Sequence, residues 1–338
     1  MNGCGVVARI RYMLARIIKM DYGKMFKIAK NVSKKCDKSF FGVFFDMIHC
    51  GMKFQAGYHD YQEFEFYNLT EEQRATYLTR GKNNAIIKRY NEKEYMGLFD
   101  DKVTFNKKFS EFLNRDWLDM NDTTPEQFAD FMKKHPSIIA KPIDGQGGFG
   151  VEKYTVDDST DLKKLYDEII EKNQKLVEAF IVQHPDMDVL YAKSVNSIRM
   201  FTFCKDGKGC FLHAILKIGN GGIVDNFSSG GMYTFPDDSG KVTVPAIDKE
   251  DILYSKHPIT GTDIIGFQIP MFDEAVELVK RAAEVIPQVR YVGWDVAISD
   301  HGPVLIEGNS FPGVFQKRAS LSENKTGILP RYREYMDI

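Results

Sequence analysis

The feature that most constrains this chain is residues 293–309, where two apolar, strand-like runs are joined by a short turn, Ser-Asp-His-Gly-Pro. Three polar side chains interrupt these runs: Asp295, Glu307 and Asn309. Glu307 and Asn309 are two residues apart, so on a strand they point to the same face, and pairing across the turn brings Asp295 beside them. Carboxylate and amide oxygens are the ligands that Mg²⁺ prefers. The sequence therefore predicts a β-hairpin that carries a magnesium site.

The composition is that of a folded chain with no general affinity for nucleic acid. The 338 residues are 43% hydrophobic and 13% aromatic, enough for two or three cores, and 45 basic against 47 acidic residues leave a net charge of −2. The five cysteines form no Cys-x-x-Cys pair, which favours a reduced, intracellular chain. No stretch is apolar for long enough to span a bilayer, and the first residues lack the pattern of a secretory signal. We expect a cytoplasmic protein.

Residues 1–53 are strongly basic. They contain eleven Lys or Arg against three Asp, a net charge of +8, and their apolar residues recur at roughly helical spacing. One interpretation is a packed helical cap with solvated lysines. The other is a docking segment for an anionic membrane face or a glycan-assembly partner, which would place the protein at the inner face of the membrane. The sequence leaves both open.

After this basic region the apolar pattern alternates between helical and strand-like periods, which predicts an α+β fold. A capping box at Thr70 and an N-cap at Thr124, followed by Pro125, mark two helix starts. We expect further helices at 106–113, 161–173 and 272–285, and strands at 137–142, 151–156, 176–182, 197–204, 210–218 and 291–298.

A glycine-rich loop follows the expected strand 137–142 and precedes another extended segment. Glycines let backbone N–H groups approach phosphate oxygens closely. The loop is no P-loop, because no Gly-Lys-Ser/Thr follows it, and no dinucleotide fingerprint, because a strand rather than a helix follows. Lys141, on the apolar strand before the loop, needs an anionic partner. We expect phosphate beside Lys141 and the loop, although a plain hairpin turn has the same composition; the loop residues are Gly145, Gln146, Gly147, Gly148, Phe149 and Gly150.

Residues 177–184 form a second candidate binding element. An extended segment between two lobes can present backbone groups to an adenine edge, with Glu178 accepting from the amino group and Phe180 or Ile181 against the ring. A plain buried strand that ends at His184 explains the same pattern. Arg199 lies among apolar residues of the expected strand 197–204, where an arginine is costly unless it meets a carboxylate or phosphate.

Taken in order, these elements resemble the ATP-grasp superfamily: a strand lysine before a glycine-rich flap, a hinge glutamate, a strand arginine and a final hairpin with Asp295, Glu307 and Asn309. Residues 194–199 and 225–231 further resemble the branch associated with sugar transfer and polysaccharide gene clusters. The resemblance implies an ATP-grasp fold, in which two α+β lobes clasp ATP. The lobes would be residues 101–183 and 184–338, after a basic helical region at 1–100.

The resemblance also implies a role for each motif residue. Lys107, or its neighbour Lys108, and Lys141 would neutralise the α- and β-phosphates under the flap. Arg199 would hold the transferring phosphoryl group, with Lys217 on the substrate side. The adenine hinge would be Glu178, Ala179, Phe180, Ile181 and His184; the acceptor loop would be Asp225, Asn226, Ser228, Ser229 and Gly230; and two Mg²⁺ would bind Asp295, Glu307 and Asn309.

Members of this superfamily usually ligate a carboxylate to an amine or thiol through an acyl phosphate, so the resemblance implies an ATP-dependent ligase. Its product would be an amide that joins an amino acid or small acid to an amino sugar, a glycan precursor or a natural product. Two alternatives stay open: an ATP-grasp kinase for a small molecule, and a non-catalytic nucleotide-binding partner. Asn106 stands where many relatives have Asp before the first lysine, a departure from which we expect little effect.

Overall fold

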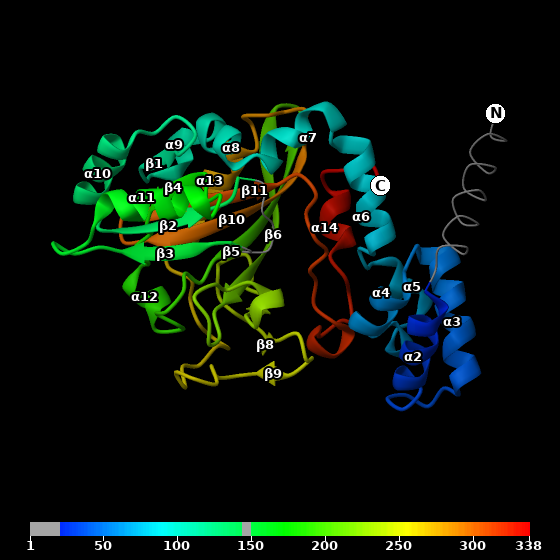
Figure 1. Cartoon of the computed structure of the whole chain (residues 1–338). Coiled ribbons are helices and arrows are strands. Elements are labelled where there is room, and N and C mark those ends of the chain that lie inside the picture. The colour runs from blue at the N-terminus through cyan, green and yellow to red at the C-terminus, as the bar shows by residue number, and fades with distance from the viewer. Residues whose placement is uncertain (1–20, 144–149) are drawn as a thin grey trace. The chain divides into compact units, whose positions relative to one another are not determined.

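The computed structural model describes residues 21–143 and 150–338. The chain divides into two compact units: the described part of Met1–Ile86 together with Gly313–Ile338, and Ile87–Pro312 (Figure 1). The flap residues Gly145 to Phe149 lie outside the described residues, whereas Gly150 lies within them. Among the described residues, no helix combines the length and apolar composition that a membrane span requires.

The first unit is helical. Its helices are α2 (Tyr22–Val32), α3 (Phe40–Phe54), α4 (Tyr58–Glu63), η1 (Phe66–Asn68), α5 (Glu71–Ala75), η3 (Ala319–Leu321) and α14 (Leu329–Arg333), and α6 (Arg80–Tyr90) continues from it into the second unit. Thr70 caps α5 through the predicted capping box with Gln73. The C-terminal segment joins this unit because the Gln316 side chain exchanges hydrogen bonds with the backbone of Leu78.

A buried ion pair holds the helices of this unit together. The Arg74 guanidinium donates to both carboxylate oxygens of Asp46 at 2.7 Å, and Tyr61 and Lys38 donate to the same carboxylate. Burial opposes ionisation of Asp46, but these donors outweigh it and hold its pKa far below the usual range. The pair therefore fixes α3 to α5.

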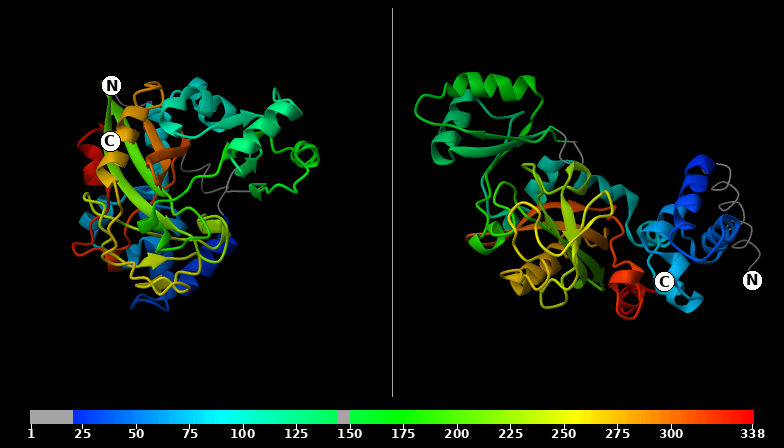
Figure 2. Two further views of the ribbon diagram at one scale, coloured as in Figure 1. Left: turned by 90° about the vertical axis from the view of Figure 1, so that its left-hand side faces the viewer. Right: turned by 90° about the horizontal axis from the view of Figure 1, so that it is seen from below.

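The second unit contains a small antiparallel sheet with the strand order β1-β4-β2-β3. Its strands are β1 (Trp117–Asp119), β2 (Ser137–Lys141), β3 (Glu152–Thr155) and β4 (Leu176–Ala179). Helices α10 (Pro125–Lys134) and α11 (Leu162–Glu171) cover one face, as Figures 1 and 2 show. Ile138, Ala140, Val177 and Ala179 pack under these helices. Because side chains alternate along a strand, Ile139, Lys141 and Glu178 point to the opposite face.

A seven-stranded antiparallel sheet forms the rest of the unit, in the order β11-β10-β5-β6-β7-β8-β9. Its strands are β5 (Ile198–Lys205), β6 (Lys208–Ile218), β7 (Met232–Thr234), β8 (Ala246–Ile247), β9 (Leu253–Tyr254), β10 (Tyr291–Ser299) and β11 (Gly302–Asn309). Two short helices, α12 (Pro185–Asp188) and η2 (Phe227–Ser229), lie in its connections.

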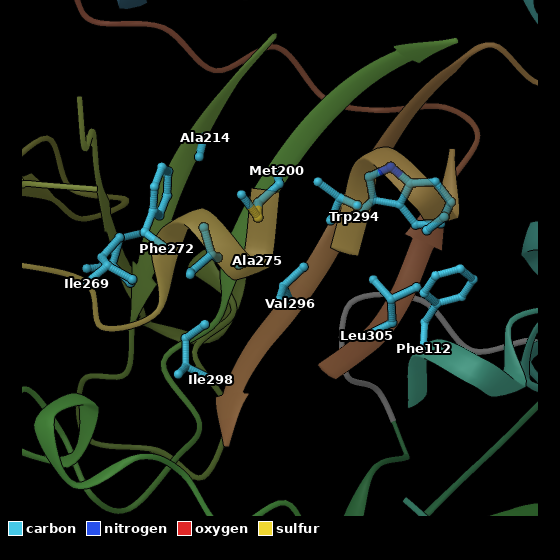
Figure 3. Packing of buried hydrophobic residues seen from close by; sticks show 14 of the residues in the cluster. Phe112, Met200, Ala214, Ile269, Phe272, Ala275, Trp294, Val296, Ile298 and Leu305 are labelled. Atoms are coloured by element: carbon cyan, nitrogen blue, oxygen red, sulfur yellow. The ribbon is translucent and has the colours of Figure 1, made fainter. Parts of the chain in front are cut away.

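One face of this large sheet is the main hydrophobic core. Helix α13 (Phe272–Ala282) packs on it through Phe272 and Ala275, beside Met200, Val296 and Ile298 (Figure 3). Phe99 of α7 (Lys93–Asp100) packs against Trp294 on the same face, as does Phe109, which lies between α8 (Lys102–Lys108) and α9 (Ser110–Leu113). The helix predicted at 106–113 is thus divided, because α8 ends before Phe109 and α9 begins at Ser110.

Candidate active site

The predicted hairpin forms from β10 and β11, and it carries a row of charged residues on the face opposite the core. Asp295 pairs with Glu307 of β11 on one side and with Arg199 of β5 on the other. Two nitrogens of Arg199 donate to the two carboxylate oxygens of Asp295, with Nη2 at 2.8 Å from Oδ2. Lys217 Nζ on β6 lies 2.8 Å from the same Oδ2. The structure therefore brings the predicted arginine, lysine and carboxylates into one cluster.

A β-bulge explains how Glu307 reaches this cluster. Asp295 pairs with Glu307 but the next residue, Val296, pairs with Leu305, so Ile306 is an extra residue in β11. Residues two apart on a regular strand share a face, but the extra residue reverses this relation. Leu305 therefore lies in the core, whereas Glu307 lies beside Asp295, and Asn309 follows with its Nδ2 3.5 Å from Glu307 Oε1.

The electrostatics of the cluster differ between the two carboxylates. Burial opposes ionisation of Asp295, but Arg199 and Lys217 outweigh it and hold its pKa far below the usual range. Burial and the neighbouring Asp295 charge raise the pKa of Glu307, whose Oε1 is 3.9 Å from Arg199 Nη2. Asp295 is thus committed to two cations, whereas the Glu307 side chain keeps 40% of its surface exposed.

The donor set fits Mg²⁺. Asp295, Glu307 and Asn309 supply hard oxygens, and the exposed Glu307 carboxylate and the Asn309 amide are open to an ion. Within residues 21–143 and 150–338, no three His, Cys, Asp or Glu side chains are grouped so that they could hold a metal ion. The hairpin set has two carboxylates and an amide. Mg²⁺ usually binds one or two carboxylates and completes its shell with water and phosphate oxygens.

A second charged cluster lies on the free face of the small sheet. Glu178 is buried, and its Oε2 lies 2.6 Å from Lys141 Nζ. Its Oε1 accepts from Arg115 Nη2 at 2.7 Å and from Asn106 Nδ2 at 2.8 Å. Burial opposes ionisation of Glu178, but Arg115 and Lys141 outweigh it and lower its pKa to about 2. Glu178 thus holds Lys141 in place.

Of the remaining hinge residues, Ala179 ends β4 and the others follow it in the chain. Ala179 packs under α10 and α11, so its side chain is in the core, although its N–H bonds the carbonyl of Asp116. Phe180 is half-buried and has Lys153 Nζ 3.6 Å from its ring centroid. Ile181 is half-buried, and His184 donates from its backbone N–H to the carbonyl of Ile298 and caps α12.

The two residues predicted as alternatives for the first nucleotide lysine are both exposed. Lys107 is 60% exposed and lies 3.8 Å from Asp119, and Lys108 is also exposed. Lys102, which the sequence reasoning passed over, donates from Nζ to the carbonyl of Ile143 at 3.1 Å, directly before the glycine loop. Its signal in the sequence is Asp101, which caps α8 and places Lys102 in the first turn.

The predicted acceptor loop is anchored beside the Arg199 cluster. Asp225 Oδ2 accepts from the backbone N–H of Ser197 at 2.7 Å and from its hydroxyl at 2.5 Å. Asn226 precedes η2, which contains the exposed Ser228 and Ser229, and Gly230, whose φ is +100°, follows it. Tyr233 pairs with Lys217 across β6 and β7, and its ring lies 5.1 Å from that of Phe227. The loop is therefore anchored next to the strand ends that carry the two cations.

Asn196 joins the hinge to the start of this loop. Its backbone N–H donates to Gln183 Oε1 at 2.5 Å, and its Oδ1 accepts from the N–H of Gly219 at 3.0 Å. His257 Nε2 lies 2.8 Å from the carbonyl of the same Gly219. A Cβ at Gly219 would lie 2.0 Å from Ser194 Oγ, so the close approach requires glycine.

Residues 81–331 match the model of the sugar-transfer associated ATP-grasp family. The match covers well over half of the chain, so the chain belongs to this family and has the ATP-grasp fold. The family and fold predicted from the motifs are confirmed.

Solved structures that resemble the chain are distant. They include the ATP-grasp ligase PsnB with precursor peptide PsnA2 and AMPPNP, at 13% identity and a TM-score of 0.41, over 73% of this chain and 61% of that one. The D-alanyl-alanine synthetase A of Vibrio cholerae has 12% identity and a TM-score of 0.39, over 71% of this chain and 61% of that one. The D-alanine–D-alanine ligase of Bacillus anthracis has 15% identity and a TM-score of 0.40, over 71% of this chain and 66% of that one. The chain thus covers less than two thirds of each. No curated protein sequence matches it.

Proposed function

We propose that the protein is an ATP-dependent ligase that joins a carboxylate to an amine through an acyl phosphate. The observation that carries the proposal is the link between the two charged clusters. Arg115 bonds Glu178 and also donates to the carbonyl oxygens of Leu305 and Ile306, directly before Glu307. A phosphate-binding lysine and an oxygen-rich metal site held together in this way suit phosphoryl transfer.

In this proposal the nucleotide binds on the free face of the small sheet. Lys141 and Lys102, or the predicted Lys107, neutralise phosphate oxygens, and the glycine loop supplies backbone N–H groups. Phe180 and Ile181 pack against the adenine, and backbone groups of the hinge meet its edge. Glu178, whose oxygens are occupied by three donors, serves mainly to hold Lys141 and Arg115.

Glu307, Asn309 and Asp295 would hold Mg²⁺, which supplies charge neutralisation at the β- and γ-phosphate oxygens. Glu307 lies beside both of the others, and it is the more exposed of the two carboxylates. Asp295 is held by Arg199 and Lys217, so it also fixes these two cations at the acceptor end of the row. We propose this end as the place where the substrate carboxylate binds.

Two displacements complete the reaction. A carboxylate oxygen of the substrate attacks the γ-phosphorus, the bond to the bridging oxygen breaks, and ADP leaves. The amine then attacks the acyl carbon, the C–O bond to phosphate breaks, and the nitrogen loses a proton as phosphate leaves. Arg199 and Lys217 stabilise the charge that develops on the phosphoryl and acyl oxygens. The glycine loop and the acceptor loop exclude water, because an acyl phosphate exposed to it hydrolyses.

The family and the acceptor loop support an amino sugar or glycan precursor as the acceptor. The family is associated with sugar transfer, and an amino sugar or glycan precursor supplies the amine in this proposal. Phe227 keeps 37% of its surface exposed beside Tyr233, and an aromatic face of this kind packs against the apolar face of a sugar ring. The acid would be an amino acid or another small carboxylate.

The test is release of ADP and free phosphate from Mg-ATP across a panel of amino acids, each with and without amino-sugar acceptors. A ligase releases both products in equal amounts and requires one acid and one amine. ADP release without free phosphate would instead identify a kinase. ATP binding without either product, across the whole panel, would leave a nucleotide-binding protein without ligase activity on these substrates.

A further inference from the structure

Helix α3 presents an apolar stripe on its outer face. Phe41, Phe45, Ile48 and Met52 follow one another at intervals of four, three and four residues, the spacing of one helical face. Phe41 is 67% exposed, Phe45 64% and Met52 52%. The opposite face, with Val43, Met47, Cys50 and Phe54, is buried and packs the unit. The helix therefore has a second apolar face, which does not pack into the core of the unit.

Helix α2 extends this surface. The Phe26 ring, 46% exposed, stacks on Phe44 at 5.1 Å and on Phe40 at 6.0 Å. Phe40 and Phe44 in turn contact the rings of Phe41 and Phe45 edge-on. The rings form one continuous aromatic surface across both helices. Contiguous exposed apolar surface of this kind marks an interaction site rather than scattered exposure.

Basic residues border the aromatic surface. Lys27 and Lys30 flank Phe26 on α2, and Lys34 and Lys35 follow the helix. All four are exposed, and none lies within ion-pair distance of a described carboxylate. Other lysines nearby have such partners: Lys38, between the two helices, binds Asp46, and Lys53 of α3 binds Glu71. The surface thus carries positive charge that the fold does not neutralise.

We propose that this surface of α2 and α3 docks on an anionic lipid bilayer. The phenylalanine rings and Met52 would enter the boundary between headgroups and acyl chains, while the four lysines pair with anionic headgroups. A second copy of the chain is a poorer occupant, because it would set lysines against lysines. The preceding sequence adds Arg9, Arg11, Arg16 and Lys19 and no acidic residue, which increases the attraction to an anionic surface.

The test is co-sedimentation of the full-length chain with vesicles. Vesicles of phosphatidylcholine with phosphatidylserine are compared with phosphatidylcholine alone, at low and high salt. We expect binding to the anionic vesicles only, weakened by salt, and reduced about tenfold or more in a Phe41→Ser/Phe45→Ser variant. The control is Ile259→Ser, which removes an apolar residue that is also mostly exposed, 57%, from the other unit and should bind like wild type.

A Lys27→Gln/Lys30→Gln variant tests the contribution of the positive charge separately. It also tests the proposal if the double serine variant has a lowered melting temperature. It should lose binding at low salt and keep the wild-type melting temperature. Three results would overturn the proposal: no binding to anionic vesicles, equal binding by the wild type and both double variants, or a dimer in solution that the serine variant dissociates. The last result would assign the surface to a second copy of the chain.

Discussion

Arg115 and Glu178 form a buried ion pair, with Nη2 2.7 Å from Oε1, and the same guanidinium donates to the carbonyl oxygen of Leu305 on β11. One side chain thus connects β4, whose Glu178 binds Lys141, with β11, which carries Glu307. Arginine suits this place because its planar fork donates in several fixed directions. Arg115 is a positioning residue for both clusters.

Replacing Arg115 by Met should destabilise the Ile87–Pro312 unit by about 3 kcal/mol, because a buried carboxylate loses a partner and backbone carbonyls lose a donor. The KM for ATP should also rise. Urea unfolding followed by tryptophan fluorescence reports on this unit, since both tryptophans, Trp117 and Trp294, lie in it.

The matched control for Arg115 is Arg281→Met. Arg281 is 64% exposed and pairs at 3.1 Å with Glu111, which is equally exposed, so its loss should cost at most about 1 kcal/mol. Equal stability of the two variants would contradict the role given to Arg115. The Arg115→Lys variant keeps the positive charge but lacks the planar guanidinium. Partial recovery of stability without recovery of the KM for ATP would show that ATP binding depends on the guanidinium geometry and not on the charge alone.

Glu178 should make the stability of this unit depend on pH in the acidic range. Its pKa is about 2 in the folded chain against 4.5 for a free glutamate. Because the pKa is lowered in the folded chain, ionised Glu178 contributes about 3 kcal/mol to the free energy of unfolding above about pH 4.5. This contribution is lost as the pH falls toward 2. The difference in free energy of unfolding between wild type and Glu178→Gln should therefore shrink below pH 4.5. Parallel profiles for the two proteins would refute this assignment.

The sequence predicts the polar row of the hairpin because its residues violate an otherwise apolar pattern. Asp295, Glu307 and Arg199 each stand out in a strand, and pairing rules place the first two together. The same reasoning locates Lys141, whose partner is Glu178. Charged residues in apolar strands are informative because burial without a partner is so costly.

Other parts of the site leave no such local signal. Arg115 lies between α9 and β1, and its bond to Leu305 joins residues 190 apart in the chain. The bulge at Ile306 depends on the register between β10 and β11, and no residue type in these strands indicates that register. The exposed stripe of α3 has the same apolar spacing as a buried helix face, so the sequence alone does not show which face of α3 is exposed.

Gly231 should tolerate no side chain, because a Cβ there would lie 2.2 Å from the carbonyl oxygen of Asp225. Gly231→Ala should shift the acceptor loop and lower the unfolding free energy by about 1–3 kcal/mol. Gly97→Ala is the control: this glycine lies in α7 with nothing within 4 Å of its added Cβ, and alanine should add about 0.5–1 kcal/mol. Opposite signs for the two variants in urea unfolding are the expected result, and equal effects would contradict the crowding at Gly231.

Glu307→Gln should separate metal binding from folding. The side chain is 40% exposed and its nearest cation is 3.9 Å away, so an isosteric amide should change the melting temperature little. If Glu307 holds Mg²⁺, the wild type should melt higher with Mg-ADP than with ADP, whereas the variant should show no such difference, and turnover should fall about 100-fold or more. Asp300→Asn is the control, because it makes the same change of charge in the turn of this hairpin and should keep the Mg²⁺ effect. Loss of the folded state in Glu307→Gln without any metal present would instead assign Glu307 a structural role.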